Sequence, residues 1–66
     1  MPRYRFDFLQ SEDVRMAVHE IDYEDDLAAI RGGHIINGAP PIGAGFQIWQ
    51  EERLVYWHRN EPTILN

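Results

Sequence analysis

Apolar and polar residues alternate along residues 3–9, Arg-Tyr-Arg-Phe-Asp-Phe-Leu. The apolar set on one face is Tyr4, Phe6 and Phe8. Successive side chains of a strand point to opposite faces, so this pattern predicts a half-buried β-strand. The polar, turn-forming residues 10–13 then predict a short hairpin connection.

The alternation resumes at Val14 and predicts a second strand near residues 14–21. The apolar positions change parity after Val18. A single shift of parity in a strand indicates an inserted residue or the end of the strand. We therefore expect a β-bulge, or the end of this strand, near residues 19–20.

The hydrophobic period then changes from two to that of a helix, which we expect near residues 24–36. The apolar stripe is formed by Leu27, Ile30, His34 and Ile35. Carboxylates at 24–26 stand in the first turn, where they favour the positive end of the helix dipole, and Asp22 or Tyr23 is the expected N-cap. Asn37-Gly38 and the prolines that follow end the helix.

Gly32 and Gly33 interrupt this helical pattern. Each glycine inside a helix costs about 1 kcal/mol relative to alanine. Either the helix tolerates them because another backbone approaches closely, or it frays after Arg31. We expect a continuous but weak helix.

Two further strands are predicted near 45–50 and 53–59, joined by a four-residue type I turn over 50–53. The resulting order, β-β-α-β-β, predicts an α+β fold of two layers, a four-stranded antiparallel sheet with one helix on one face. Residues 1–59 form one domain and residues 60–66 a C-terminal tail. The order of the strands in the sheet stays open. The predicted core is Phe6, Phe8, Val18, Leu27, Ile30 and Ile48.

Large apolar side chains occupy both faces of the C-terminal hairpin, and one helix can cover only one of them. Aromatic residues are enriched in the cores of protein interfaces. We expect the second face to form a homodimer contact. The interface candidates are Trp49, Trp57, Tyr56 and Tyr4. The alternative is that Ile64 and Leu65 of the tail fold over this face.

The composition of the chain excludes some kinds of site and disfavours others. The 66 residues include no cysteine, so disulfides and thiolate metal sites are excluded. The net charge of −5 disfavours binding to phosphate backbones through a basic face, and all six cations are arginines. The chain lacks an 18-residue apolar run and a signal-like segment. We therefore expect a cytoplasmic protein without membrane contact.

The acidic cluster is the densest charge on the chain and comprises Glu20, Asp22, Glu24, Asp25 and Asp26. A calcium loop that starts at Asp22 would need glycine and a carboxylate where the chain has Leu27 and Gly33. Helix capping and solubility are therefore its expected roles.

No catalytic arrangement is apparent in the sequence. The histidines His19, His34 and His58 lack the spacing of a helical zinc motif. Ser11 and Thr63 both fall in expected loops. We expect neither enzymatic activity nor a metal or other cofactor.

The chain resembles a widespread group of very short bacterial proteins of unknown function, which open with Met-Pro-Arg-Tyr-aromatic-Phe. The residues that carry the resemblance are Met1 to Leu9, Ile21 to Asp26, Phe46 to Gln50 and Arg53 to Val55. Glu51-Glu52 departs from the glycine-containing turn of the group, and Gly32-Gly33 from its helix formers. The group implies no catalytic residues.

The sequence thus predicts a small non-enzymatic interaction module that homodimerises through its sheet. One alternative is a binder of nucleic acid or a small ligand that uses exposed aromatic rings as a stacking platform. The other is an acidic decoy that occupies the cationic groove of a partner protein.

Overall fold

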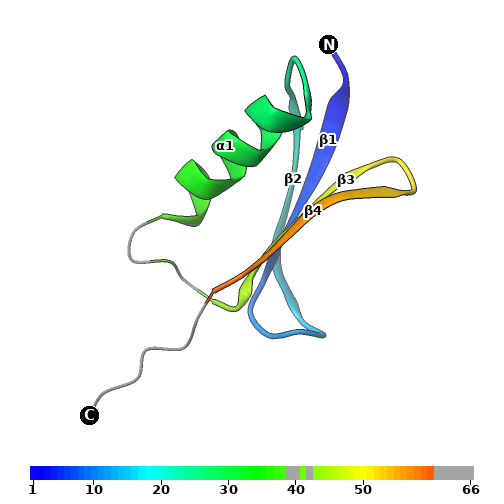
Figure 1. The fold of residues 1–66 in the computed structure, drawn as a ribbon. Coiled ribbons are helices and arrows are strands. Elements are labelled where there is room, and N and C mark those ends of the chain that lie inside the picture. The colour runs from blue at the N-terminus through cyan, green and yellow to red at the C-terminus, as the bar shows by residue number, and fades with distance from the viewer. Residues whose placement is uncertain (39–40, 42, 61–66) are drawn as a thin grey trace.

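The computed structural model describes residues 1–38, 41 and 43–60, and its fold is α+β, with four antiparallel strands and one helix on one face of the sheet (Figure 1). The elements, in chain order, are β1 (Arg3–Leu9), β2 (Arg15–Asp22), α1 (Asp26–Asn37), β3 (Gly45–Gln50) and β4 (Arg53–Arg59). The predicted β-β-α-β-β order and architecture are confirmed. Of the predicted tail, only Asn60 lies within the described residues.

The strand order is β2-β1-β3-β4, so the two hairpins meet through β1 and β3 in the middle of the sheet. Phe6 pairs with Ile48, and Phe8 with Phe46. These four side chains lie beneath α1 and are almost fully buried. The same alternation that makes β1 a strand thus supplies the centre of the core.

The core predictions are correct for Phe6, Phe8 and Ile48, and Ile30 is partly buried against them. They are wrong for Leu27 and Val18, which are 56% and 48% exposed. Both errors have a geometric cause, one in α1 and one in β2.

In α1, small residues rather than large ones face the sheet. Ala29, Gly32 and Gly33 are buried, and the rings of Tyr23 and Phe46 lie directly against the two glycines. The helix is continuous, as predicted, but aromatic side chains approach it and not another backbone. With this side of α1 turned toward the core, Leu27 lies on the outer side of the helix.

The helix also begins later than predicted, at Asp26. Its N-cap is Asp25 rather than Asp22 or Tyr23, and the Asp25 carboxylate accepts a hydrogen bond from the Ala28 amide at 2.8 Å.

In β2, the irregularity lies before Ala17, not at residues 19–20. Phe8 pairs with Ala17 and the next residue of β1, Leu9, pairs with Arg15, so β2 contains one extra residue there. Beyond this bulge, His19 and Ile21 fall on the helix side of the sheet, and Val18 falls on the opposite side. The apolar character of Val18 therefore does not mark the core face.

The turn between β3 and β4 differs from the prediction. Gln50 pairs with Arg53, which leaves Glu51 and Glu52 as the central residues. Glu51 has a φ of 55°. A type I turn needs a φ near −60° at this position, so the predicted turn type is wrong.

Candidate functional site

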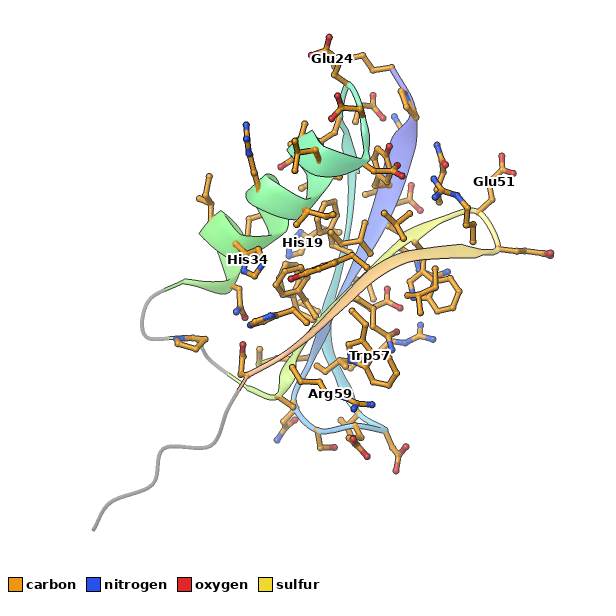
Figure 2. All side chains as sticks on the ribbon, viewed as in Figure 1. His19, Glu24, His34, Glu51, Trp57 and Arg59 are labelled. Atoms are coloured by element: carbon orange, nitrogen blue, oxygen red, sulfur yellow. The ribbon has the colours of Figure 1, made fainter. Side chains whose placement is uncertain are left out.

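The side of the sheet away from α1 is called the open face. It is formed by alternate residues of all four strands, and Figure 2 shows Trp57 and Arg59 on this side and His34 on the helix side. Its members, taken from the strand register, are Arg3, Arg5, Asp7, Leu9, Arg15, Val18, Glu20, Asp22, Gln47, Trp49, Leu54, Trp57 and Arg59.

Both tryptophans lie on the open face, each beneath an arginine. The guanidinium carbon of Arg5 is 5.6 Å from the ring centroid of Trp49, and that of Arg59 is 4.1 Å from Trp57. The indole N–H of Trp49 also donates to the Gln47 side chain at 3.1 Å. These contacts are cation–π pairs, which hold the rings flat on the sheet.

A buried carboxylate lies in the middle of the open face. Asp7 is only 1% exposed, although the helix that the structure describes lies on the other side of the sheet. Arg5 donates to it through Nε at 3.0 Å and Nη2 at 3.3 Å, and Arg15 Nε lies 3.7 Å away. The arginine side chains thus compensate the cost of removing this charge from water.

Three apolar side chains of the open face are accessible to solvent. Val18, Leu54 and Trp57 are 48%, 43% and 39% exposed. The only helix in the described part of the chain lies on the other side of the sheet. Ile64 and Leu65, the alternative cover, lie outside the described residues.

The two tyrosines among the interface candidates belong to the helix side. Tyr4 is 1% exposed, and its hydroxyl donates to Asp26 at 2.7 Å. Tyr56 packs against the core, and its hydroxyl lies 3.0 Å from His34 Nε2. The tryptophans therefore share a surface, and the tyrosines do not contribute to it.

The acidic cluster is divided among separate structural contacts. Asp25 caps α1, Asp22 pairs with Arg3 at 3.0 Å, and Glu20 lies 3.9 Å from Arg3. Glu24 is exposed at the end of the molecule that carries the β2–α1 connection (Figure 2). Within residues 1–38, 41 and 43–60, no three histidine or acidic side chains converge as metal ligands would.

Asp26 joins three elements. Its carboxylate accepts from both Arg53 terminal nitrogens at 3.2 Å and from the Tyr4 hydroxyl. The Arg53 hydrogen bonds, followed by that of Tyr4, lower the pKa of Asp26. The same carboxylate raises the pKa of Tyr4. These bonds tie β4 and β1 to the first turn of the helix.

This arrangement predicts an acid-sensitive contribution to stability. The pKa of Asp26 in the folded chain is below its ordinary value of about 3.9. The contribution of ionised Asp26 to the free energy of unfolding is therefore complete above a pH of about 3.9, and it is lost as the pH falls through the pKa of Asp26 in the folded chain. Asp26→Asn should lower the free energy of unfolding near neutral pH, and the difference from wild type should shrink at a pH of about 2.5. Urea titrations at both pH values measure this.

Arg53→Gln is the matched variant, because it removes the main cause of the shift. The double variant should lose no more than the larger single loss, since both changes break one contact. Equal differences from wild type at both pH values would contradict the assignment.

Two histidines and a tyrosine come together where α1 ends, a grouping that the sequence spacing did not reveal. The rings of His34 and His58 lie 4.7 Å apart, centroid to centroid, and Tyr56 is two residues from His58 on the same side of β4. His19 stays apart, against Phe8. The three histidines therefore do not form one site.

An open cleft of ≈ 450 Å³ lies between the start of β1 and the β3–β4 turn. Its lining residues are Pro2, Arg3, Arg5, Glu20, Gln50 and Glu51. The lining contains two carboxylates, Glu20 and Glu51, but no serine, threonine, cysteine, lysine or histidine.

A second exposed apolar surface lies on the outer side of α1, where Leu27 and Ile35 are 56% and 80% exposed. These residues are two turns apart, with Arg31 between them. They provide a control for experiments on the open face.

Comparisons of the chain with family models, with curated proteins and with solved structures found no match. The resemblance to short bacterial proteins thus stays a prediction. None of the helices that the structure describes has the length and apolar character to span a bilayer.

Proposed function

We propose that this protein is a small non-enzymatic interaction module that forms a homodimer by stacking the open faces of two copies. The observation that carries the proposal is an exposed apolar group, Val18, Leu54 and Trp57, on the side of the sheet opposite α1. Leu54 and Trp57 adjoin Trp49 on β3 and β4, and an exposed apolar patch of this kind is typical of interaction sites. Val18 lies on the opposite edge of the sheet, beyond Asp7 and Gln47.

The size of the chain supports a partner on this face. A domain of about 60 residues buries only roughly 60% of the surface of its unfolded chain, so its stability as a monomer is marginal. A two-layer sheet-on-sheet contact would bury the tryptophans and add a second apolar layer. A second copy supplies such a layer without any other component.

The area of the face sets the expected strength. Four strands of about six residues give a face of roughly 20 Å by 20 Å. This is small beside the ~800 Å² per partner that stable complexes bury. We therefore expect reversible association, with a dissociation constant on the order of micromolar to 100 micromolar.

Trp57→Ala tests the proposal. Truncation of this exposed tryptophan should weaken self-association by about 2 kcal/mol, roughly thirtyfold, because aromatic anchors dominate such contacts. Sedimentation velocity over a concentration series measures the effect. The melting temperature of wild type should also rise with concentration, and that of the variant should not.

Ile35→Ala is the matched control, since it removes an exposed apolar side chain from the outer side of α1. It should leave association unchanged. A wild-type chain that is monomeric at about 100 µM would refute the dimer. Loss of association in Ile35→Ala but not in Trp57→Ala would show that the dimer contact lies on α1 and not on the open face.

A second candidate function is a stacking platform for a nucleic acid or small ligand, favoured by the arginine over each tryptophan. Against it, Arg5 is bound to Asp7, and Arg59 lies 3.9 Å from Glu12. Titration with single-stranded oligonucleotides separates the two functions. Saturable, salt-sensitive quenching of tryptophan fluorescence would favour the platform.

The third alternative, an acidic decoy, has less support. Asp22 and Asp26 are engaged with Arg3 and Arg53 of the same chain. An acidic surface that mimics a polyanion needs its carboxylates free for the partner's cations.

A further inference from the structure

We infer that the two copies stack with their strands antiparallel, about a two-fold axis that is perpendicular to the strands, so that β4 lies over β4 and β2 over β2 of the partner. This inference rests on the proposed dimer. It comes from the distribution of charge along the two edge strands of the open face.

Each edge of the open face carries an arginine at one end and carboxylates at the other. Arg15 and Arg59 lie at the same end, because Arg15 pairs with Leu9, Leu9 with Gly45, and Gly45 with Arg59. The β2 edge ends at Asp22, which pairs with Arg3 of its own chain, and the β4 edge begins at Arg53, directly after the acidic turn residues Glu51 and Glu52. Figure 2 shows Glu51 at the tip of the β3–β4 hairpin and Arg59 at the opposite end of the sheet.

Two symmetric ways exist to stack aligned sheets face to face. If the two-fold axis runs along the strands, β2 lies over the partner's β4 and the ends coincide. Arg15 of each copy then faces Arg59 of the other. If the axis is perpendicular to the strands, the ends are exchanged. Arg15 then faces Asp22 of the second copy, and Arg59 faces its acidic turn.

The centre of the open face does not distinguish the two stacks, because Val18 lies over the partner's Trp57 in the parallel stack and over its Glu20 in the antiparallel stack. Two neighbouring rows of side chains cross the strands there. One row holds Arg5, Trp49 and Leu54, and the other holds Asp7, Gln47 and Trp57. Reversal about an axis between these two rows places Leu54 over Trp57 of the other copy. It also brings Arg5 toward the opposite Asp7, so the two ion pairs form one neutral group.

The charges are expected to determine orientation more than affinity. Exposed ion pairs contribute little free energy, but like charges placed opposite each other exclude an arrangement. Most of the affinity would still come from the apolar side chains.

Arg15→Asp distinguishes the two orientations by the sign of its effect. In the antiparallel stack it opposes two carboxylates to each other at both ends of the stacked β2 strands, so the dimer should weaken, by about tenfold. In the parallel stack it replaces an arginine pair by an ion pair, so the dimer should tighten. Sedimentation equilibrium gives both constants, and circular dichroism verifies that the variant is folded.

A mixture of two variants with complementary charges should recover the affinity of the dimer. Asp22→Arg alone should also weaken the dimer, but an equimolar mixture with Arg15→Asp restores opposite charges at both ends of the stacked β2 strands. The mixed dimer should approach the wild-type constant within about threefold. Failure of the mixture to associate better than either variant alone would overturn the inference.

A second measurement does not depend on these energies. The chain has no cysteine, so single cysteines can be added without interference. A mixture of Arg59→Cys and Glu52→Cys should form a heterodimer with a short bismaleimide. Preferential cross-linking of Arg59→Cys to Arg15→Cys would establish the parallel stack and overturn the inference. A wild-type chain that never dimerises would instead refute the proposed function.

Discussion

Phe6→Ala is expected to leave most of the chain unfolded at 25 °C. Phe6 is 0% exposed, and its ring lies 6.3 Å from that of Phe8 and 5.8 Å from that of Tyr23, centroid to centroid. Truncation of a buried phenylalanine costs about 3–5 kcal/mol. A domain of this size has little more than that to lose. Urea unfolding followed by circular dichroism, at one fixed protein concentration, measures the loss.

Leu27→Ala is the informative control, because Leu27 was predicted to lie in the same core. At 56% exposure it should change the free energy of unfolding by only about 0.5 kcal/mol. Phe6→Leu, which retains most of the volume, should cost less than about 1.5 kcal/mol. A loss below about 1 kcal/mol for Phe6→Ala would contradict the core described above.

The strand boundaries were predictable because alternation is a strong local signal. The predicted ranges 3–9, 45–50 and 53–59 coincide with β1, β3 and β4. In β2 the alternation led to the wrong prediction that Val18 is buried. The bulge before Ala17 changes which residues of β2 face the core, and Val18 lies exposed on this edge strand. The position of a bulge depends on the partner strand and cannot be found in one strand's pattern.

The helix shows a different limit. Its apolar stripe was inferred from large side chains, yet the buried surface is made of Ala29, Gly32 and Gly33. Those glycines appeared as a weakness of the helix. In the fold they are the space into which Tyr23 and Phe46 fit, a fact that depends on aromatic residues outside the helix.

The candidate site was predictable only in part. Apolar residues on both faces of the second hairpin indicated an uncovered surface, and Trp49 and Trp57 do share it. The alternation of β1 already put Tyr4 on the same face as Phe6 and Phe8, but the placement of Tyr56 on the helix side, and the burial of Asp7 beside Arg15, were not predicted. They depend on the order β2-β1-β3-β4, which the sequence left open.

Gly33→Ala is expected to destabilise the protein, although alanine is the better helix former by about 1 kcal/mol. A methyl group at this position would lie 2.5 Å from Phe46 Cε2 and 3.0 Å from Cζ. The ring has no free space to move into, because it is 0% exposed and has Phe8, His34 and Tyr56 within 6 Å, centroid to centroid. Overpacking of this kind costs about 1–3 kcal/mol, so the net change should be a loss.

Gly32→Ala is the matched comparison, since it makes the same change one residue earlier. Its methyl group would meet the hydroxyl end of Tyr23, a partly exposed side chain that can rotate away. The loss should therefore be smaller than for Gly33→Ala, and urea titrations of both variants measure the difference. If both substitutions stabilise the chain by about the helix propensity of alanine, α1 does not pack on Phe46 through its glycines. Other residues of α1 would then face the core, and the orientation of the helix that exposes Leu27 would be wrong.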